Sequence, residues 1–177
     1  MRWKPGDRRE SVESMIRVDQ AGEYGATRIY AGQLAVMGDR SDTARAIAGM
    51  ANQEERHRRF FDALIAQRGV RPTALQPVWN AAGFALGAAT AAIGPAAAMA
   101  CTVAVETEID IHYRDQLATL GEDDQTLSDA VAEFRAEELE HRDTALAAGA
   151  ETAPAYPLLS AAIRLACRGA IGLSKRL

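Results

Sequence analysis

The chain has 177 residues and a formal net charge of −4, which argues against general nucleic-acid binding. This length fits one domain that can bury its own core. Alanine is abundant, aromatic residues make up only 6% of the chain, and no β-like alternation is visible, so we expect an all-α fold. Residues 1–10 lack the apolar stretch of a secretory signal, so we expect the protein to remain in the cytosol or against its membrane.

The two cysteines, Cys101 and Cys167, form no CxxC pair and have no neighbouring histidine. They therefore predict neither a disulfide framework nor a zinc site. We interpret them as small apolar residues in a reducing compartment.

The first part of the chain predicts two helices joined by a short turn. Ser11 is a plausible N-cap for a helix over 11–37, and Gly38 ends the helical pattern. A second helix is predicted over 41–67 and stops before Gly69. The short connection makes these helices antiparallel neighbours.

The later part of the chain repeats this arrangement. A helix over 95–120 begins at Pro95, because proline is well tolerated in a first turn, and Gly121 ends it. The next helix, over 124–148, ends at Gly149. This pair is also predicted to be antiparallel.

A long uncharged connection separates the two pairs. It includes 76–94, which predicts a separate apolar helix, and a stretch of this length raises the question of a transmembrane crossing. Crossing is not favoured, because Gly94 and Pro95 divide the stretch and both pairs must join one bundle. We expect a helix that lies on lipid or feeds an apolar channel, with an ordinary buried crossover as the alternative.

The C-terminal segment 157–177 predicts a basic amphipathic helix. All its charges are positive, and leucine and isoleucine supply an apolar surface, which suits an anionic membrane face. A fifth helix packed on the bundle is the alternative, and the two interpretations are compatible.

Both halves carry the same pattern of acids and imidazoles. A glutamate is followed 31 or 32 residues later by Glu-x-x-His. The residues are Glu23, Glu54 and His57 in the first half, and Glu106, Glu138 and His141 in the second. Because residues three apart share one face of a helix, each Glu-x-x-His can face a single ion.

Four helices therefore suffice for six metal ligands, which is the arrangement of ferritin-like di-iron proteins. Carboxylate and imidazole donors together suit iron or manganese. The sequence predicts an all-α, ferritin-like four-helix bundle, with solvated acidic helices as the alternative. Asp19 and Asp110 lie four residues from Glu23 and Glu106, and we expect one or both to hold a ligand histidine by its second nitrogen.

Several longer runs resemble the demethoxyubiquinone hydroxylase family, and the similarity extends from Met15 over nearly the whole chain. The runs are DQAGEYGA at 19–26, RIYAGQ at 28–33, RPTALQPVWNAAGFALGA at 71–88, ACTVAVE at 100–106 and EELEH at 137–141. The resemblance implies an O2-dependent monooxygenase that hydroxylates a polyprenylated quinol in ubiquinone biosynthesis. It implies two iron ions on the six residues above, with His112 and Tyr113 as candidates for residues beside them. We assign no separate acid or base.

The resemblance further implies a peripheral membrane protein, on the cytoplasmic face of a bacterial inner membrane or the matrix side of a mitochondrial one. The electron donor would be NADH or the quinol itself, and a lipid-binding accessory protein is an expected partner. We expect 76–94 and the C-terminal segment to form a membrane-facing mouth. A quinol oxidase of the alternative-oxidase type and a non-enzymatic iron-binding protein remain alternatives for the same ligands.

Overall fold

The computed structural model describes residues 12–120 and 124–177, and throughout these ranges the regular elements are helices. The all-α, ferritin-like bundle is confirmed. The predicted N-cap Ser11 and the predicted helix end at Gly121 lie outside the described residues.

The first helical pair is α1 (Val12–Met37) and α2 (Asp42–Arg68). Gly38 has a φ of 68° and turns the chain between them. The hydroxyl oxygen of Ser41 accepts a hydrogen bond from the Ala44 N–H and caps α2. Gly69 ends α2 in the left-handed conformation that glycine adopts without strain.

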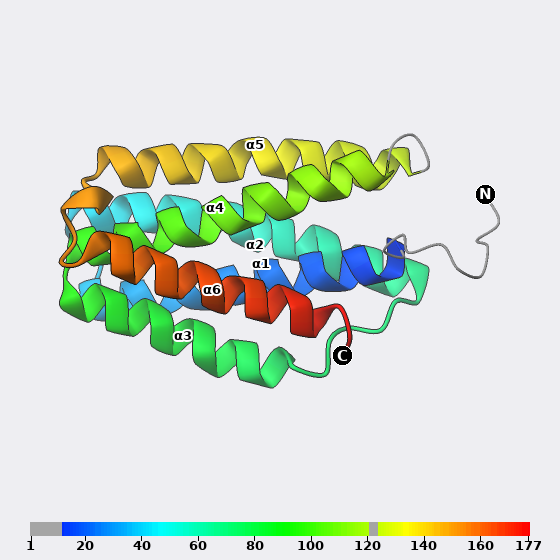
Figure 1. Cartoon of the computed structure of the whole chain (residues 1–177), viewed down its shortest axis with the longest axis horizontal. Coiled ribbons are helices and arrows are strands. Elements are labelled where there is room, and N and C mark those ends of the chain that lie inside the picture. The colour runs from blue at the N-terminus through cyan, green and yellow to red at the C-terminus, as the bar shows by residue number, and fades with distance from the viewer. Residues whose placement is uncertain (1–11, 121–123) are drawn as a thin grey trace.

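The second pair is α4 (Pro95–Leu120) and α5 (Gln125–Ala147), with Asp124 capping α5 through the Leu127 N–H. These two helices and the first pair lie side by side and form the four-helix bundle (Figure 1). Helix α4 begins at the end of the bundle where the α1–α2 turn lies, whereas α2 ends at the opposite end (Figure 1). The chain therefore has to return along the length of the bundle before α4 begins.

Helix α3 (Gln76–Ile93) carries out this return along the outside of α1. Glycines allow the two backbones to approach closely: a Cβ added to Gly87 would lie 1.9 Å from the carbonyl oxygen of Ile29. The other face of α3 is exposed at residues such as Val78 and Phe84. Over the described residues, no helix combines the length and apolarity needed to cross a membrane.

Helix α6 (Tyr156–Ser174) follows a 3₁₀ turn, η1 (Ala150–Thr152), and packs on α4. Two of its basic residues face the bundle, because Arg164 and Arg168 donate hydrogen bonds to the buried carboxylate of Glu108. Leu158 and Leu165 on its outer side are 73% and 71% exposed. The helix therefore packs on the bundle and also presents an apolar outer face.

Two apolar clusters fill the bundle on either side of its centre. One contains Met15, Phe61 and Leu127, and the other contains Ile47 and Met99. The buried acids and histidines belong to neither cluster. Packed apolar layers therefore shield the polar centre from water on both sides.

Candidate metal centre

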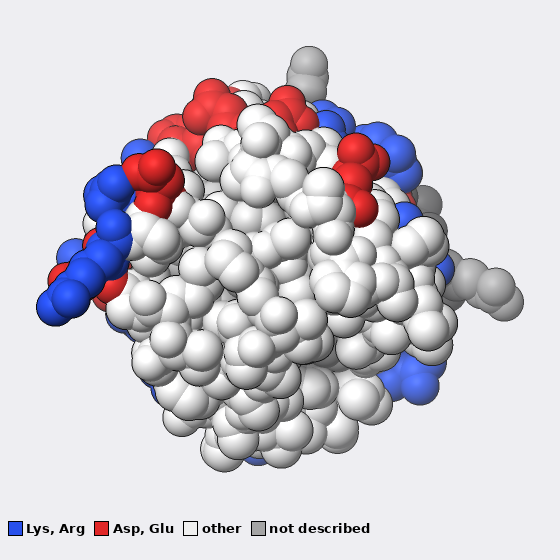
Figure 2. Space-filling view, turned by 90° about the vertical axis from the view of Figure 1, so that its left-hand side faces the viewer, with Lys and Arg blue, Asp and Glu red and all other residues white. Residues whose placement is uncertain are grey.

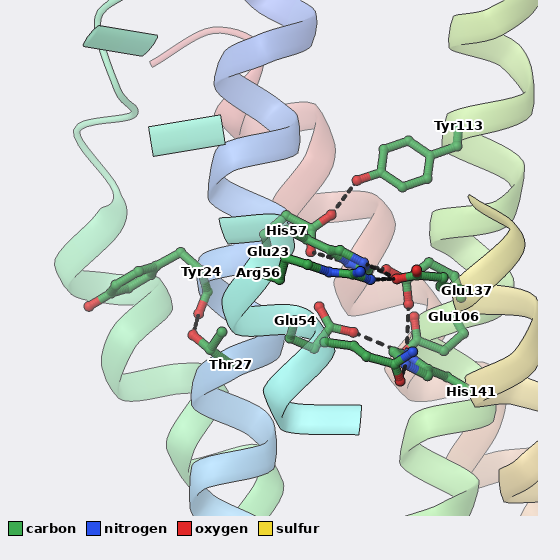
Figure 3. Close-up of polar contacts among 12 residues, drawn as sticks. Glu23, Tyr24, Thr27, Glu54, Arg56, His57, Glu106, Tyr113, Glu137 and His141 are labelled. Atoms are coloured by element: carbon green, nitrogen blue, oxygen red, sulfur yellow. Dashed lines mark hydrogen bonds and ion pairs between the residues drawn. The ribbon is translucent and has the colours of Figure 1, made fainter. Parts of the chain in front are cut away.

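The six predicted ligands meet at the centre of the bundle (Figure 3). Each of the four bundle helices contributes at least one, and every one is at most 2% exposed. Their donor atoms form two groups, and within each group the atoms lie within 4.8 Å of one another. One group is Glu23, Glu54, His57 and Glu138, and the other is Glu54, Glu106, Glu138 and His141.

Two glutamates, Glu54 and Glu138, belong to both groups. One carboxylate oxygen of Glu138 lies 3.1 Å from Nδ1 of His57, and its other oxygen lies 3.0 Å from Nδ1 of His141. The two shared carboxylates therefore stand between two cation positions. We call the one beside His57 and Glu23 the His57 position, and the one beside His141 and Glu106 the His141 position.

Both imidazoles turn Nδ1 toward the carboxylates and Nε2 away from them. Nε2 of His57 lies 2.6 Å from Oε2 of Glu137, and Nε2 of His141 lies 2.9 Å from Oε1 of Gln53. These oxygens can only accept, so each Nε2 carries the proton and donates it. In the neutral imidazole, the Nδ1 lone pair is then free to bind a cation.

Two glutamates, Glu23 and Glu106, each belong to one cation position only, and we call them the terminal glutamates. Each accepts a hydrogen bond from a buried tyrosine of the other half of the chain. Tyr30 on α1 donates a hydrogen bond to Glu106 on α4 at 2.9 Å, and Tyr113 on α4 donates to Glu23 on α1. Each hydroxyl orients one oxygen of its glutamate and leaves the second oxygen facing the centre.

Four of the carboxylate oxygens are buried without a hydrogen-bond partner among the described residues. They are both oxygens of Glu54 and one oxygen each of Glu23 and Glu106. Orphaned acceptors are costly in a protein interior, and a bound cation would satisfy all four. This donor set therefore fits two metal ions of the kind that carboxylate and imidazole ligands favour.

The directions of the pKa shifts indicate that the buried carboxylates favour a positive charge among them. Burial, together with the charge of Glu138, raises the pKa of Glu54 and of Glu106 well above the ordinary value of 4.5. Burial opposes protonation of His57, but hydrogen bonds with Glu138 and Glu23 outweigh it and raise its pKa to about 10. The carboxylates thus stabilise whichever cation, proton or metal, shares the centre with them.

Comparison with known proteins gives the family. The profile described as "Ubiquinone biosynthesis protein COQ7" matches residues 10–174. The chain belongs to the COQ7 family.

Several curated members of this family are close to the chain. It is 52% identical over 174 residues to a 3-demethoxyubiquinol 3-hydroxylase of Rhodospirillum rubrum, covering 97% of this chain and 82% of that protein. It is 51% identical over 173 residues to the human NADPH-dependent 3-demethoxyubiquinone 3-hydroxylase, mitochondrial (96% and 79%). The 5-demethoxyubiquinone hydroxylase, mitochondrial, of Saccharomyces cerevisiae is 40% identical over 182 residues (94% and 78%).

Of the four residues predicted to lie beside the ligands of this COQ7-family chain, only Tyr113 contacts one. The expectation that Asp19 or Asp110 holds a ligand imidazole is wrong. Asp19 instead accepts hydrogen bonds from Gln116 and, at 3.0 Å, from His112, while Asp110 pairs with Arg135. The error arose because each imidazole turns its second nitrogen toward the other histidine-bearing helix, α5 for His57 and α2 for His141, and not toward α1 or α4, which carry the two aspartates.

Three contacting residues were missed by sequence reasoning: Tyr30, Gln53 and Glu137. The internal repeat carries a signal for each of them. Tyr30 and Tyr113 both lie seven residues after the first glutamate of their half, and Gln53 and Glu137 both directly precede the second. Aligning the two halves beyond the six ligands would have marked these positions.

An apolar cavity of about 180 Å³ lies between α1, α3, α4 and α6. Of the described residues that line it, Glu108 is the single charged one, and both arginines of α6 hold its carboxylate. Ala26 and Val105 line this cavity and also border a small gap, too tight for a water molecule, beside Tyr30 and Glu106. The cavity therefore adjoins the acid cluster but does not open onto it.

Proposed function

We propose that this COQ7-family chain is an O2-dependent di-iron monooxygenase that hydroxylates the ring of a demethoxyubiquinol in ubiquinone biosynthesis. The observation that carries the proposal is a pair of adjoining candidate cation positions that share two buried carboxylates and lie near an apolar cavity. The family and the names of its hydroxylase members support the same reaction.

Two iron ions are the proposed occupants, held by the six residues of the centre. When bound, they supply the redox chemistry by which O2 is activated. One oxygen atom of O2 enters the ring as a hydroxyl group and the other leaves as water, which requires two electrons from a reductant. A reduced nicotinamide nucleotide is the proposed donor, since the names of mammalian relatives include NADPH; NADH or the quinol itself are the other candidates.

The protein's own part is to hold this centre rigid and dry. The shared glutamates fix the spacing of the two positions, and the tyrosine hydroxyls fix the terminal acids. Phe134 stacks on the His57 ring with 4.1 Å between the ring centroids. These contacts preorganise the centre before substrate arrives, which lowers the reorganisation needed during the reaction.

The cavity between α1, α3, α4 and α6 is the proposed substrate site. Its apolar walls match a polyprenyl tail, and Ala26 and Val105, which lie between the cavity and Glu106, would have to move apart for a quinol ring to reach the centre. Leu86 on α3 and Ile171 on α6 line the cavity, so these two outer helices form its entrance.

A lipid surface is the proposed source of the substrate, because both entrance helices are apolar on their outer sides. The uncharged area continues over the end of the bundle where α3 meets α4 and α6 begins, with charges confined to its margins (Figure 2). Ile93 and Leu158 lie there and are 56% and 73% exposed. We therefore propose that the protein attaches peripherally to a membrane through this surface. The proposed location is the cytoplasmic face of a bacterial inner membrane or the matrix face of a mitochondrial one. A lipid-binding accessory protein is the proposed partner at the same surface.

The reaction is tested by single turnover. Protein loaded anaerobically with ferrous ions is mixed with a demethoxyubiquinol and O2, and the product is examined by mass spectrometry. We expect a quinone that has gained one oxygen atom, and labelled oxygen when ¹⁸O2 is used. Glu138→Gln should abolish the product, whereas Glu140→Gln, an exposed glutamate on the same helix, should not. Unmodified quinone with water as product would indicate a quinol oxidase instead, and iron uptake without turnover would indicate an iron-binding protein.

The lipid surface has its own test. Flotation with anionic liposomes should recover the natural protein in the lipid fraction, and Leu165→Glu should reduce that fraction. Ala132→Glu, an exposed position on α5, is the matched control and should float normally. Leu86→Glu should impair turnover even of a short-tailed, water-soluble quinol, because Leu86 lines the cavity itself. Equal flotation of all variants together with unchanged activity of Leu86→Glu would refute this entrance.

A further inference from the structure

The two cation positions differ in the residue behind each histidine. The Nε2–H of His57 donates to the carboxylate of Glu137 at 2.6 Å (Figure 3). The Nε2–H of His141 donates to the amide oxygen of Gln53 at 2.9 Å. Glu137 and Gln53 occupy equivalent places in the internal repeat, directly before Glu138 and Glu54. At one position, then, the acceptor is an anion, and at the other it is neutral.

The remaining surroundings are closely matched. Each position has one terminal glutamate, one histidine and the two shared glutamates, and each terminal glutamate accepts a hydrogen bond from a tyrosine. Glu137 is therefore the main difference: it adds a fourth carboxylate to the three that surround the His57 position.

The charge of Glu137 is only partly offset from outside. Arg56 also donates to Glu137, but the arginine side chain is 52% exposed, so water screens its charge. His57 itself is fully buried beneath Phe134, where screening is weak. Glu137 therefore remains an anion in direct contact with a buried imidazole.

We infer that Glu137 is a positioning residue that makes the His57 position the tighter of the two, so that it fills first. A carboxylate behind a ligand imidazole fixes the ring and strengthens Nδ1 as a donor, and such partners change metal affinity by about 10–100-fold. An amide acceptor orients the ring but adds no charge. The inference rests on the proposed metal centre and adds an order of filling to it.

The test is an anaerobic calorimetric titration of the metal-free full chain with cobalt(II), which provides spectroscopic signals that zinc does not. The natural protein should bind two ions in steps at least about tenfold apart. Glu137→Gln should weaken the first step by about 10–100-fold and bring the two together, and Gln53→Glu should tighten the second step. The double variant that combines Glu137→Gln with Gln53→Glu should again bind two ions in separate steps, but the His141 position should now fill first.

Proton NMR of the cobalt protein locates the first ion. With one equivalent bound, a single shifted imidazole N–H signal should appear. Glu137→Gln should displace it, whereas Gln53→Glu should keep it and add a second signal from the other imidazole. Two equal steps in the natural protein, or separated steps retained in Glu137→Gln, would overturn the order of filling while leaving the metal centre intact. Failure of the natural chain to bind cobalt or ferrous ions at all would overturn both.

Discussion

The close contact between α1 and α3 can be tested by glycine-to-alanine substitutions. We expect the substitution to lower the free energy of unfolding at Gly87, which lies in this contact, and to raise it at Gly49, which does not. A Cβ at Gly87 would lie 1.9 Å from the carbonyl oxygen and 2.8 Å from the carbonyl carbon of Ile29, and 3.1 Å from the Gln33 nitrogen. All three are backbone atoms, so no side chain can rotate away and the helices must separate. Gly49 on α2 is exposed, and a Cβ there would meet nothing within 4 Å.

Replacing glycine by alanine inside a helix gains about 1 kcal/mol of stability at either site. At Gly87 the overlap should cost about 3 kcal/mol, at the upper end for overpacking, since rigid backbone receives it. Gly49→Ala should therefore raise the free energy of unfolding by about 1 kcal/mol, and Gly87→Ala should lower it by about 2 kcal/mol. In thermal unfolding of a chain this long, these changes correspond to roughly 2–4 °C upward and 4–8 °C downward.

Guanidinium unfolding of the metal-free proteins, followed by circular dichroism, measures both values without a contribution from bound metal. The difference between the two variants isolates the steric term, because the gain in helix propensity is common to both. If Gly87→Ala proved as stable as Gly49→Ala, α3 would not lie against α1 at this distance. The cavity that both helices border would then also need revision.

Two further predictions concern buried and capping acids. Glu54→Gln should raise the stability of the metal-free protein by about 1–2 kcal/mol, because a neutral amide replaces a fully buried carboxyl group whose charged form is disfavoured by burial and by Glu138. The same variant should lose the gain of about 2.7 kcal/mol that metal at 100 times its Kd gives the natural protein, and a large loss of metal-free stability would contradict the reasoning. At the start of α5, the hydrogen bond from Arg68 lowers the pKa of Asp124 below its ordinary 3.8, and the Leu127 N–H adds to this against the opposing effect of burial. A lowered pKa stabilises the fold above pH 3.8 and less as pH falls through the lowered value, so Asp124→Asn should flatten the acid side of the stability curve measured by urea unfolding.

The two Glu-x-x-His pairs of the proposed ligand set were predictable from sequence because they depend on the geometry of a single helix. Glu54 and His57, like Glu138 and His141, are three residues apart, and that spacing fixes a shared face whatever the rest of the fold does. The turn signals were equally local: Gly38 and Gly69 adopt the positive φ that ends a helix. Features set within one or two turns of a single helix could therefore be derived before any tertiary structure was known.

Contacts between helices could not be derived in this way. The acceptor for His57 comes from α5 and that for His141 from α2, so each depends on how two helices are rotated against each other. Arg164 and Arg168 looked like a membrane-binding pair, yet both face Glu108, whose distance in sequence gave no hint of the contact. Sequence periodicity specifies which face a residue occupies, but a partner's face is fixed only by packing.

The uncharged crossover shows how composition and packing together produce a site. Glycines on α1 and α3 draw the two backbones together, so α3 needs only one narrow face to attach to the bundle. Its remaining surface can stay apolar and exposed, and α6, held to α4 through Glu108, closes the other side of the space. Were α3 attached by large side chains instead, these would occupy the cavity between α1, α3, α4 and α6. The same small residues that made the segment resemble a weak transmembrane helix thus leave room for the cavity that we propose as the entrance from lipid, as Leu86→Glu and Gly87→Ala would separately test.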